Sequence, residues 1–187
     1  MKYDIIILFK MKKFTVPARV NVSANNQVLF DNLQKAVGFV PNMYAFFAHS
    51  PTALSDYLTL QNRKNSLSNK EKEVINLVVS QLNGCNYCKA AHTAIAKMVG
   101  FTEEQTLEIR RATISFNPKL NSLVNIAKEI VTNKGEVSEE TKQSFFEEGY
   151  TTENLVDVVM TVGDKIITNY LFAIAKVPID FPEPPKI

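Results

Sequence analysis

Residues 83–92 read NGCNYCKAAH, and this stretch holds both cysteines of the chain, Cys85 and Cys88, and one of its two histidines, His92. Two residues separate the cysteines, and three separate Cys88 from His92. On an α-helix, which turns by about 100° per residue, Cys88 and His92 fall about 40° apart. Side chains four residues apart on a helix are neighbours. The spacing therefore predicts a dithiol and an imidazole on one face of one helix.

The pair Asn83-Gly84 interrupts the helical pattern before it, which puts Cys85 and Cys88 in the first turn of a new helix. At a helix start the unpaired N–H groups and the positive end of the dipole favour an anion. A helix start or a nearby histidine lowers the pKa of a cysteine, and the thiolate is the reactive form. The position of the two cysteines thus favours thiol chemistry.

Three other interpretations of the cysteines compete with this one. They could be buried structural residues beside a core histidine, because cysteine is among the most buried residue types. They could be half of a zinc site, but only His49 remains as a fourth ligand for the usual set of four. Haem attachment requires a histidine directly after the second cysteine, where this chain has Lys89.

Composition narrows the class of protein. The chain has 187 residues, 45% of them hydrophobic and 21% charged, which suits one globular domain with a sizeable core. A net charge of +2 without a long basic run gives no electrostatic footprint for nucleic acid. Two cysteines in so long a chain are not a secreted disulfide framework. A CxxC pair of this kind favours a redox-active dithiol in a reducing compartment, and we expect a cytoplasmic protein.

The two ends of the chain lack the helical pattern that its middle shows. The apolar run Ile5–Phe9 is too short for a membrane span or a signal sequence, so we expect no membrane association. Met11 is a possible alternative start, and residues 1–26 are interpreted as a peripheral N-terminal extension. Residues 177–187 contain four prolines and are expected to form an extended tail on the surface.

Between these ends, helix signals recur every 10 to 20 residues and no segment shows sustained two-residue alternation. Two capping boxes, Ser68 with Glu71 and Thr102 with Gln105, mark helix starts. The pattern predicts an all-α helical bundle over residues 27–176. The expected helices cover 27–37, 41–49, 51–61, 70–82, 85–99, 103–117, 119–132, 138–149 and 153–175.

Glu73 and the last helix carry two further expectations. Glu73 borders the apolar arc of its helix, about 40° from Leu77, so that periodicity alone favours a solvated residue. The nearby dithiol favours a functional role for Glu73 instead, because a histidine beside a thiol needs a carboxylate to orient it. The last helix is apolar nearly all round, so it must be central or lie in a subunit interface. We therefore expect a homo-oligomer.

These motifs together are similar to a known family. The chain resembles the alkylhydroperoxidase D / carboxymuconolactone decarboxylase family, in its peroxidase-related branch, over roughly residues 38–115. The resemblance rests on GFVPN at 38–42, AHSP at 48–51, Leu67-Ser68 leading into Glu71 and Glu73, VSQLNGCNYC at 79–88, and Ala91-His92. It implies an all-helical protein that assembles as a homo-oligomer, often a trimer or hexamer.

The resemblance also implies an activity and roles. Peroxidase members reduce hydroperoxides with the dithiol: Cys88 would attack the peroxide, Cys85 would resolve it as a disulfide, and His92 with Glu73 would relay protons. An external dithiol would restore the pair, and no flavin, haem, other cofactor or metal is needed. Tyr87 stands where well-studied members have a second histidine, and a phenol, which titrates near 10, is a poorer base. We expect Cys85, nearer the helix start, to be the more exposed thiol.

Two rival functions stay open on the sequence. One is a carboxymuconolactone decarboxylase-like activity on a lactone, although those members typically lack the dithiol. The other is a redox-sensing or disulfide-exchanging oligomer, in which the disulfide forms without peroxidase turnover.

Overall fold

The computed structural model describes residues 14–187, and in that range its regular structure is helical, without strands, as the sequence predicts. The expectations for the first ten residues and for Met11 lie outside the described part of the chain. The helices are the short 3₁₀ turn η1 (Arg19–Asn21), α1 (Ala24–Val37), α2 (Asn42–Phe47), α3 (Ala53–Gln61), α4 (Asn69–Leu82), α5 (Asn86–Met98), α6 (Glu103–Arg111), α7 (Pro118–Thr132), α8 (Glu139–Glu147) and α9 (Thr152–Ala175).

Side-chain caps fix where these helices begin. The Ser68 hydroxyl accepts a hydrogen bond from the N–H of Glu71, and the Glu71 carboxylate accepts one from the N–H of Ser68. Thr102 and Gln105 form the same reciprocal pair at the start of α6. Both capping boxes of the sequence are thus confirmed, and each satisfies two N–H groups that a helix start leaves without partners.

Helix α1 begins at Ala24, three residues before the predicted start at Gln27. The reason is a cap: the Ser23 hydroxyl accepts from the N–H of Asn26. Asn26 itself is fully buried and its side chain donates to the carbonyl oxygens of Ala48 and Ser50 at the end of α2. A buried polar residue at this position breaks the apolar period, so that hydrophobic spacing alone could not find the first turn.

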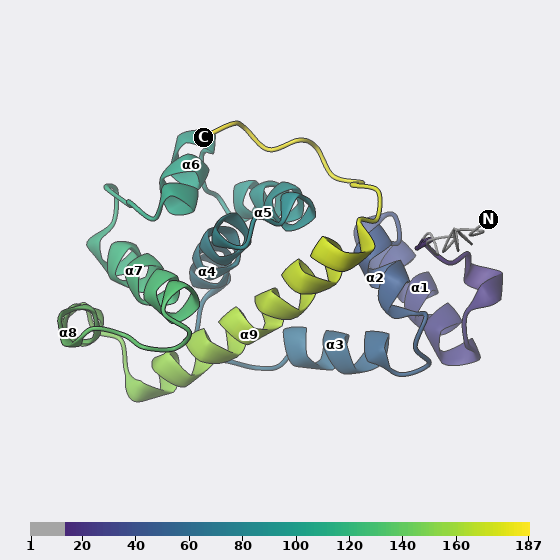
Figure 1. Cartoon of the computed structure of the whole chain (residues 1–187), viewed down its shortest axis with the longest axis horizontal. Coiled ribbons are helices and arrows are strands. Elements are labelled where there is room, and N and C mark those ends of the chain that lie inside the picture. Colours follow the sequence, from purple (N-terminus) through teal and green to yellow (C-terminus); the bar gives the residue numbers. More distant parts are fainter. Residues whose placement is uncertain (1–13) are drawn as a thin grey trace, which may run out of the picture.

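Helix α4 is the centre of the molecule and packs against α5, α6, α7 and α9 (Figure 1). One apolar core lies around the middle of α4 with α6, α7 and the first half of α9. A second apolar core joins α1, α2 and α3 to the start of α5 and the end of α9. The dithiol stretch between α4 and α5 belongs to the second core.

Helix α9 is built the opposite way from an ordinary amphipathic helix. Its buried side includes Asp157, Asp164, Lys165 and Asn169, while a row of large apolar side chains faces outward. These exposed residues are Val156, Val159, Met160, Ile167, Tyr170 and Ile174. From the sequence alone α9 is apolar nearly all round. In the structure its few polar residues are concentrated on the side that faces the site described below.

By length and composition α9 is the one helix in residues 14–187 that could cross a membrane. Half of its most apolar stretch is buried inside the fold, however, and the buried side is polar. Helix α9 therefore serves as a core helix of this bundle.

The proline-rich tail after α9 is held against the bundle. In Figure 1 it runs over α5 from the end of α9 to α6. The Asp180 carboxylate accepts a hydrogen bond of 2.7 Å from the N–H of Asn42, at the start of α2. Arg110 of α6 donates to the carbonyl oxygen of Pro185 over 2.7 Å. These contacts fix the tail above the helix that carries the cysteines.

Candidate active site

The start of α5 positions the two cysteines. Gly84 has φ of +66°, a left-handed conformation that glycine adopts without strain, and the chain then turns sharply out of α4. Cys85 is the cap residue of α5 rather than part of its first turn. Its sulfur accepts a hydrogen bond of 3.2 Å from the N–H of Cys88. The two cysteines form a disulfide in this structure, so the pair is close enough for the redox cycle of a CxxC motif.

Both cysteines are buried, at 2% exposed for Cys85 and 3% for Cys88. The expectation that Cys85 is the more exposed thiol is therefore wrong. Cys85 belongs to an apolar cluster that includes Phe172 at the end of α9 and Val177 at the start of the tail. The sequence of α5 alone could not reveal this covering, because it comes from residues about 90 positions away.

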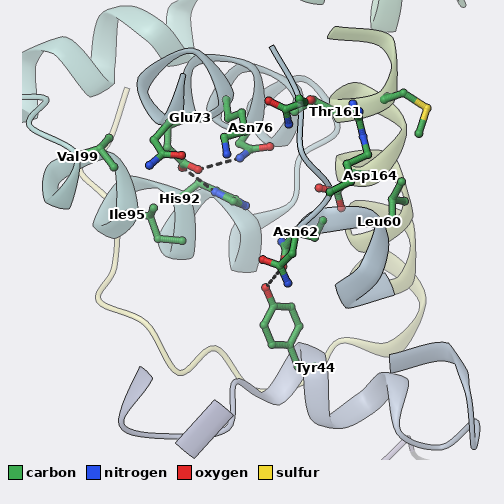
Figure 2. Close-up of a pocket in the computed structure, with 16 residues that line it drawn as sticks. Tyr44, Leu60, Asn62, Glu73, Asn76, His92, Ile95, Val99, Thr161 and Asp164 are labelled. Carbon is green, nitrogen blue, oxygen red and sulfur yellow. Dashed lines mark hydrogen bonds and ion pairs between the residues drawn. The ribbon is translucent and has the colours of Figure 1, made fainter. Parts of the chain in front are cut away.

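His92 of α5 lies against Glu73 of α4. The distance from His92 Nδ1 to Glu73 Oε2 is 2.8 Å, and the Asn76 side-chain amide donates to Glu73 Oε1 over 2.9 Å (Figure 2). Glu73 and His92 are each only 7% exposed. The Glu73 side chain is thus not the solvated residue that periodicity favours, but a buried partner of the imidazole.

Opposing effects act on the Glu73 carboxyl. Burial favours its neutral form, but the attraction and hydrogen bond of His92, together with Asn76, outweigh burial and hold the pKa of Glu73 below its ordinary value. An ionised Glu73 accepts hydrogen bonds only, so Nδ1 of His92 carries the proton between the two residues. When the imidazole is neutral, its Nε2 is therefore the unprotonated nitrogen, which can accept a proton from another group.

A polar pocket of about 300 Å³ opens on the Glu73 side of His92. Figure 2 shows Glu73 and Asn76 at one end of it, Tyr44 at the opposite end, and Thr161 and Asp164 of α9 along its side. One oxygen of Asp164 is buried without a hydrogen-bond partner in the described part of the protein. The pocket thus brings polar side chains of α2, α4 and α9 around the carboxylate and the imidazole.

A second, mostly apolar cavity of about 410 Å³ lies on the Cys88 side of the same imidazole. Cys88 and His92 both line it, and they are neighbours one turn apart on α5. Its remaining wall is mainly apolar and includes Phe39, Met43, Ala91, Ile95, Met98 and Phe181. The sulfur that can react and the base that can activate it thus face one volume able to hold an organic molecule.

Tyr87, which lies between the two cysteines in the sequence, has a structural role in the wall of this cavity. Its hydroxyl accepts from the N–H of Met43 over 3.2 Å, and its ring packs against Phe172 and Phe181. Burial raises the pKa of the Tyr87 hydroxyl far above its ordinary value. The phenol is therefore protonated throughout the neutral range and does not replace a second histidine as a base.

His49, the remaining candidate for a four-ligand zinc site, lies elsewhere. Its Nε2 is 2.8 Å from the carbonyl oxygen of Thr15, and its ring packs against Phe46. It lines a shallow pocket beside α9 that contains neither cysteine nor His92. The four residues that the zinc alternative needs are not brought together.

Several residues around the site are not among those that the sequence predicts. Asn76 orients Glu73, Lys165 lines the cavity, and Phe181 reaches it from the tail. For Lys165 the sequence does contain a signal, because the charged pair Asp164-Lys165 interrupts an otherwise apolar helix. Asn76 and Phe181 carry no such signal, because their contacts depend on how distant segments pack.

Comparison with known proteins agrees with this geometry. The model of the "Carboxymuconolactone decarboxylase family" matches residues 47–129, which include Glu73, both cysteines and His92. The uncharacterized protein YdfG of Bacillus subtilis is 24% identical over 103 residues, which are 54% of this chain and 70% of that protein.

Solved structures show the same fold. An alkylhydroperoxidase AhpD core, an uncharacterized peroxidase-related protein from Ralstonia eutropha, superposes with a TM-score of 0.78 at 21% identity, over 86% of this chain and 88% of that one. The debrominase Bmp8, solved with 2,3,4-tribromopyrrole, superposes with a TM-score of 0.75 at 16% identity, over 91% and 93%. Residues 47–129 are thus similar to the carboxymuconolactone decarboxylase family, and the chain has the all-α fold of the alkylhydroperoxidase D-like structures.

Proposed function

We propose that this protein is a dithiol-dependent peroxidase that reduces hydroperoxides through Cys85 and Cys88. One observation carries the proposal: Cys88 and His92 line the same cavity, and His92 Nδ1 is held 2.8 Å from the buried carboxylate of Glu73. A nucleophile next to a base that is oriented by a third group is the arrangement that activates thiols.

The first step takes place with the pair in its dithiol form. His92 Nε2 accepts the proton of the Cys88 thiol, and Glu73 stabilises the resulting imidazolium. The thiolate attacks the terminal oxygen of the hydroperoxide, the O–O bond breaks, and Cys88 becomes a sulfenic acid. His92 returns the proton to the departing alkoxide, so that an alcohol leaves.

The second step closes the disulfide. The Cys85 sulfur attacks the sulfur of the Cys88 sulfenic acid and forms the S–S bond. The displaced hydroxide takes up the proton of the Cys85 thiol and leaves as water. The sum is one hydroperoxide and two thiols converted into one alcohol, one water and one disulfide. An external dithiol, either a small molecule or a protein, then reduces the disulfide by exchange, as it would in a reducing cytoplasm. The chemistry uses thiols and protons and calls on no cofactor.

The apolar outer row of α9 supports a further part of the proposal, association of the chain with copies of itself. Six large apolar side chains are exposed along this helix, whereas its buried side is partly polar. Rows of this kind mark interaction surfaces. Light scattering at micromolar concentration tests it: a mass of several chains, such as a trimer or hexamer, is expected, and a monomer contradicts it.

The central experiment measures peroxide consumption by the pre-reduced protein with excess dithiol. Many turnovers are expected for the natural chain and none for Cys88→Ser. Consumption that stops after one equivalent, despite a dithiol that reduces the pair, would favour the redox-sensing alternative. No thiol oxidation at all would leave the cysteines as structural residues and would contradict the proposal.

A further inference from the structure

Lys165 is the most unusual group in the cavity beside Cys88. It is only 1% exposed, in the middle of α9, and it lines that cavity. Its ammonium makes no ion pair or side-chain hydrogen bond within residues 14–187. Removing a charged group from water without a partner is unfavourable. An anion bound in the cavity would supply the partner that the protein itself leaves out.

The carboxylates near Lys165 do not fill that role. Glu73 is close enough for the charge of Lys165 to help lower its pKa, but both Glu73 oxygens are engaged by His92 and Asn76. Asp164 lines the polar pocket rather than the cavity. No Asp or Glu of residues 14–187 lines the cavity, so its lining has one lysine and no carboxylate.

Two tyrosines that line the cavity, Tyr44 and Tyr57, are neutral. Burial raises the pKa of Tyr44 to about 12 and that of Tyr57 well above its ordinary value, so both keep their protons at neutral pH. Their hydroxyls are linked through the side-chain amide of Gln61. Val37 and Met98 also line the cavity and are exposed, so the side of the cavity that meets solvent at these residues is apolar.

We propose that the cavity binds an amphipathic organic anion, with its carboxylate at Lys165 and its apolar part directed toward Met98 and Val37. The volume of about 410 Å³ is within the range of pockets that hold small organic ligands. Resting on the peroxidase function proposed above, this identifies the substrate class as organic hydroperoxides that carry a carboxylate. Lys165 is then the residue that determines this specificity.

Binding of unreactive probes tests the assignment without any turnover. Decanoate and 1-decanol share an apolar chain and differ in the anionic group. Isothermal titration to the disulfide form is expected to give a dissociation constant at least about tenfold lower for decanoate, as a charged hydrogen bond provides. Lys165→Met is expected to bring the two dissociation constants together by weakening decanoate alone.

Lys89→Met is the matched control, because Lys89 is on the same helix as Cys88 but lines a different pocket. It should leave the preference for decanoate unchanged. If Lys165→Met does not fold by circular dichroism, Lys165→Gln provides the same comparison. Equal binding of the two probes by the natural chain, or a preference that survives both Lys165 variants, would overturn the proposal. Anion-selective binding in a protein without peroxide turnover would contradict only the peroxidase function.

Discussion

The two pockets on either side of His92 differ in almost every respect except the wall they share. The pocket on the Glu73 side is polar and is lined by two carboxylates, those of Glu73 and Asp164, and by the cationic side chains of Arg63 and Lys72. The cavity on the Cys88 side is mostly apolar and carries one lysine and no carboxylate within residues 14–187. The imidazole separates a region that handles protons from a region that can hold an organic molecule next to a sulfur.

This separation has a physical advantage. A carboxylate close to Cys88 would oppose ionisation of the thiol, because like charges raise the pKa of an acid. Glu73 acts through the imidazole instead, with its charge balanced by a hydrogen bond on each oxygen. A negative charge can therefore support the base while the nucleophile stays in a neutral or positive environment.

The largest expected effect comes from the cavity side, by removal of the nucleophile. Cys88→Ser should lower peroxide turnover by on the order of 10³-fold or more, because no other group in the cavity can form the sulfenic acid. Cys85→Ser is the matched variant: it should still consume one equivalent of peroxide and accumulate a sulfenic acid on Cys88. A stopped-flow peroxide assay with trapping of the sulfenic acid distinguishes them. If Cys88→Ser also consumed one equivalent, or if the sulfenic acid accumulated only in Cys88→Ser, the assigned roles would be reversed or removed.

On the polar side, Glu73→Gln should lower kcat/KM for peroxide by about 10²-fold, because the amide cannot stabilise the imidazolium. Steady-state kinetics with a dithiol reductant measure this loss. Glu103→Gln changes an exposed carboxylate that is paired with Lys97 and lines neither of the two pockets, and it should leave kcat/KM unchanged. If Glu73→Gln kept full activity, the polar pocket would have no part in the chemistry.

Phe181 of the C-terminal tail forms part of the apolar wall of the cavity beside Cys88, and its removal tests that wall. Phe181→Ala should lower kcat/KM for an organic hydroperoxide by about tenfold, the scale of lost apolar contacts, and change that for hydrogen peroxide little. Parallel kinetics with cumene hydroperoxide and hydrogen peroxide provide the ratio. Phe146→Ala, a partly exposed ring on α8, serves as control. Equal losses for both peroxides would show that Phe181 supports the fold rather than the fit of the substrate.

The polar pocket should also make stability depend on pH. The pKa of Glu73 is lower in the folded protein than its ordinary value of about 4.3. Its contribution to folding is therefore present above about pH 4.3 and is lost as the pH falls through the folded pKa. The free energy of unfolding of the natural chain should approach that of Glu73→Gln in acid. A gap between the two proteins that stays constant from neutral to acid pH would contradict this linkage.

The smallest expected effect concerns the start of the helix that carries Glu73. Ser68→Ala removes the cap of α4 and should cost about 1 kcal/mol of folding free energy, measured by urea unfolding, with unchanged kcat/KM. Ser144→Ala changes an exposed serine inside α8 and should cost less. A large loss of activity in Ser68→Ala would mean that the cap also sets the position of Glu73.

The sequence could predict those parts of the protein that depend on local chemistry. The two capping boxes fix helix starts, because they satisfy backbone groups within a few residues. The spacing CxxCxxxH places a disulfide-forming pair and an imidazole on one helix for the same local reason. Residues 177–187 could be recognised as non-helical from their prolines, but not as a strap held over α5.

The tertiary structure decided what depends on contacts between distant segments. It buried Glu73 against His92 across two helices, covered Cys85 with the end of α9 and the tail, and turned the polar side of α9 toward the site. Periodicity ranks residues by how apolar their own helix face is, so it underestimates a charged residue whose partner lies on another helix. Glu73 is such a residue. Lys165 has no partner within residues 14–187, and its burial likewise depends on long-range packing that no local pattern contains.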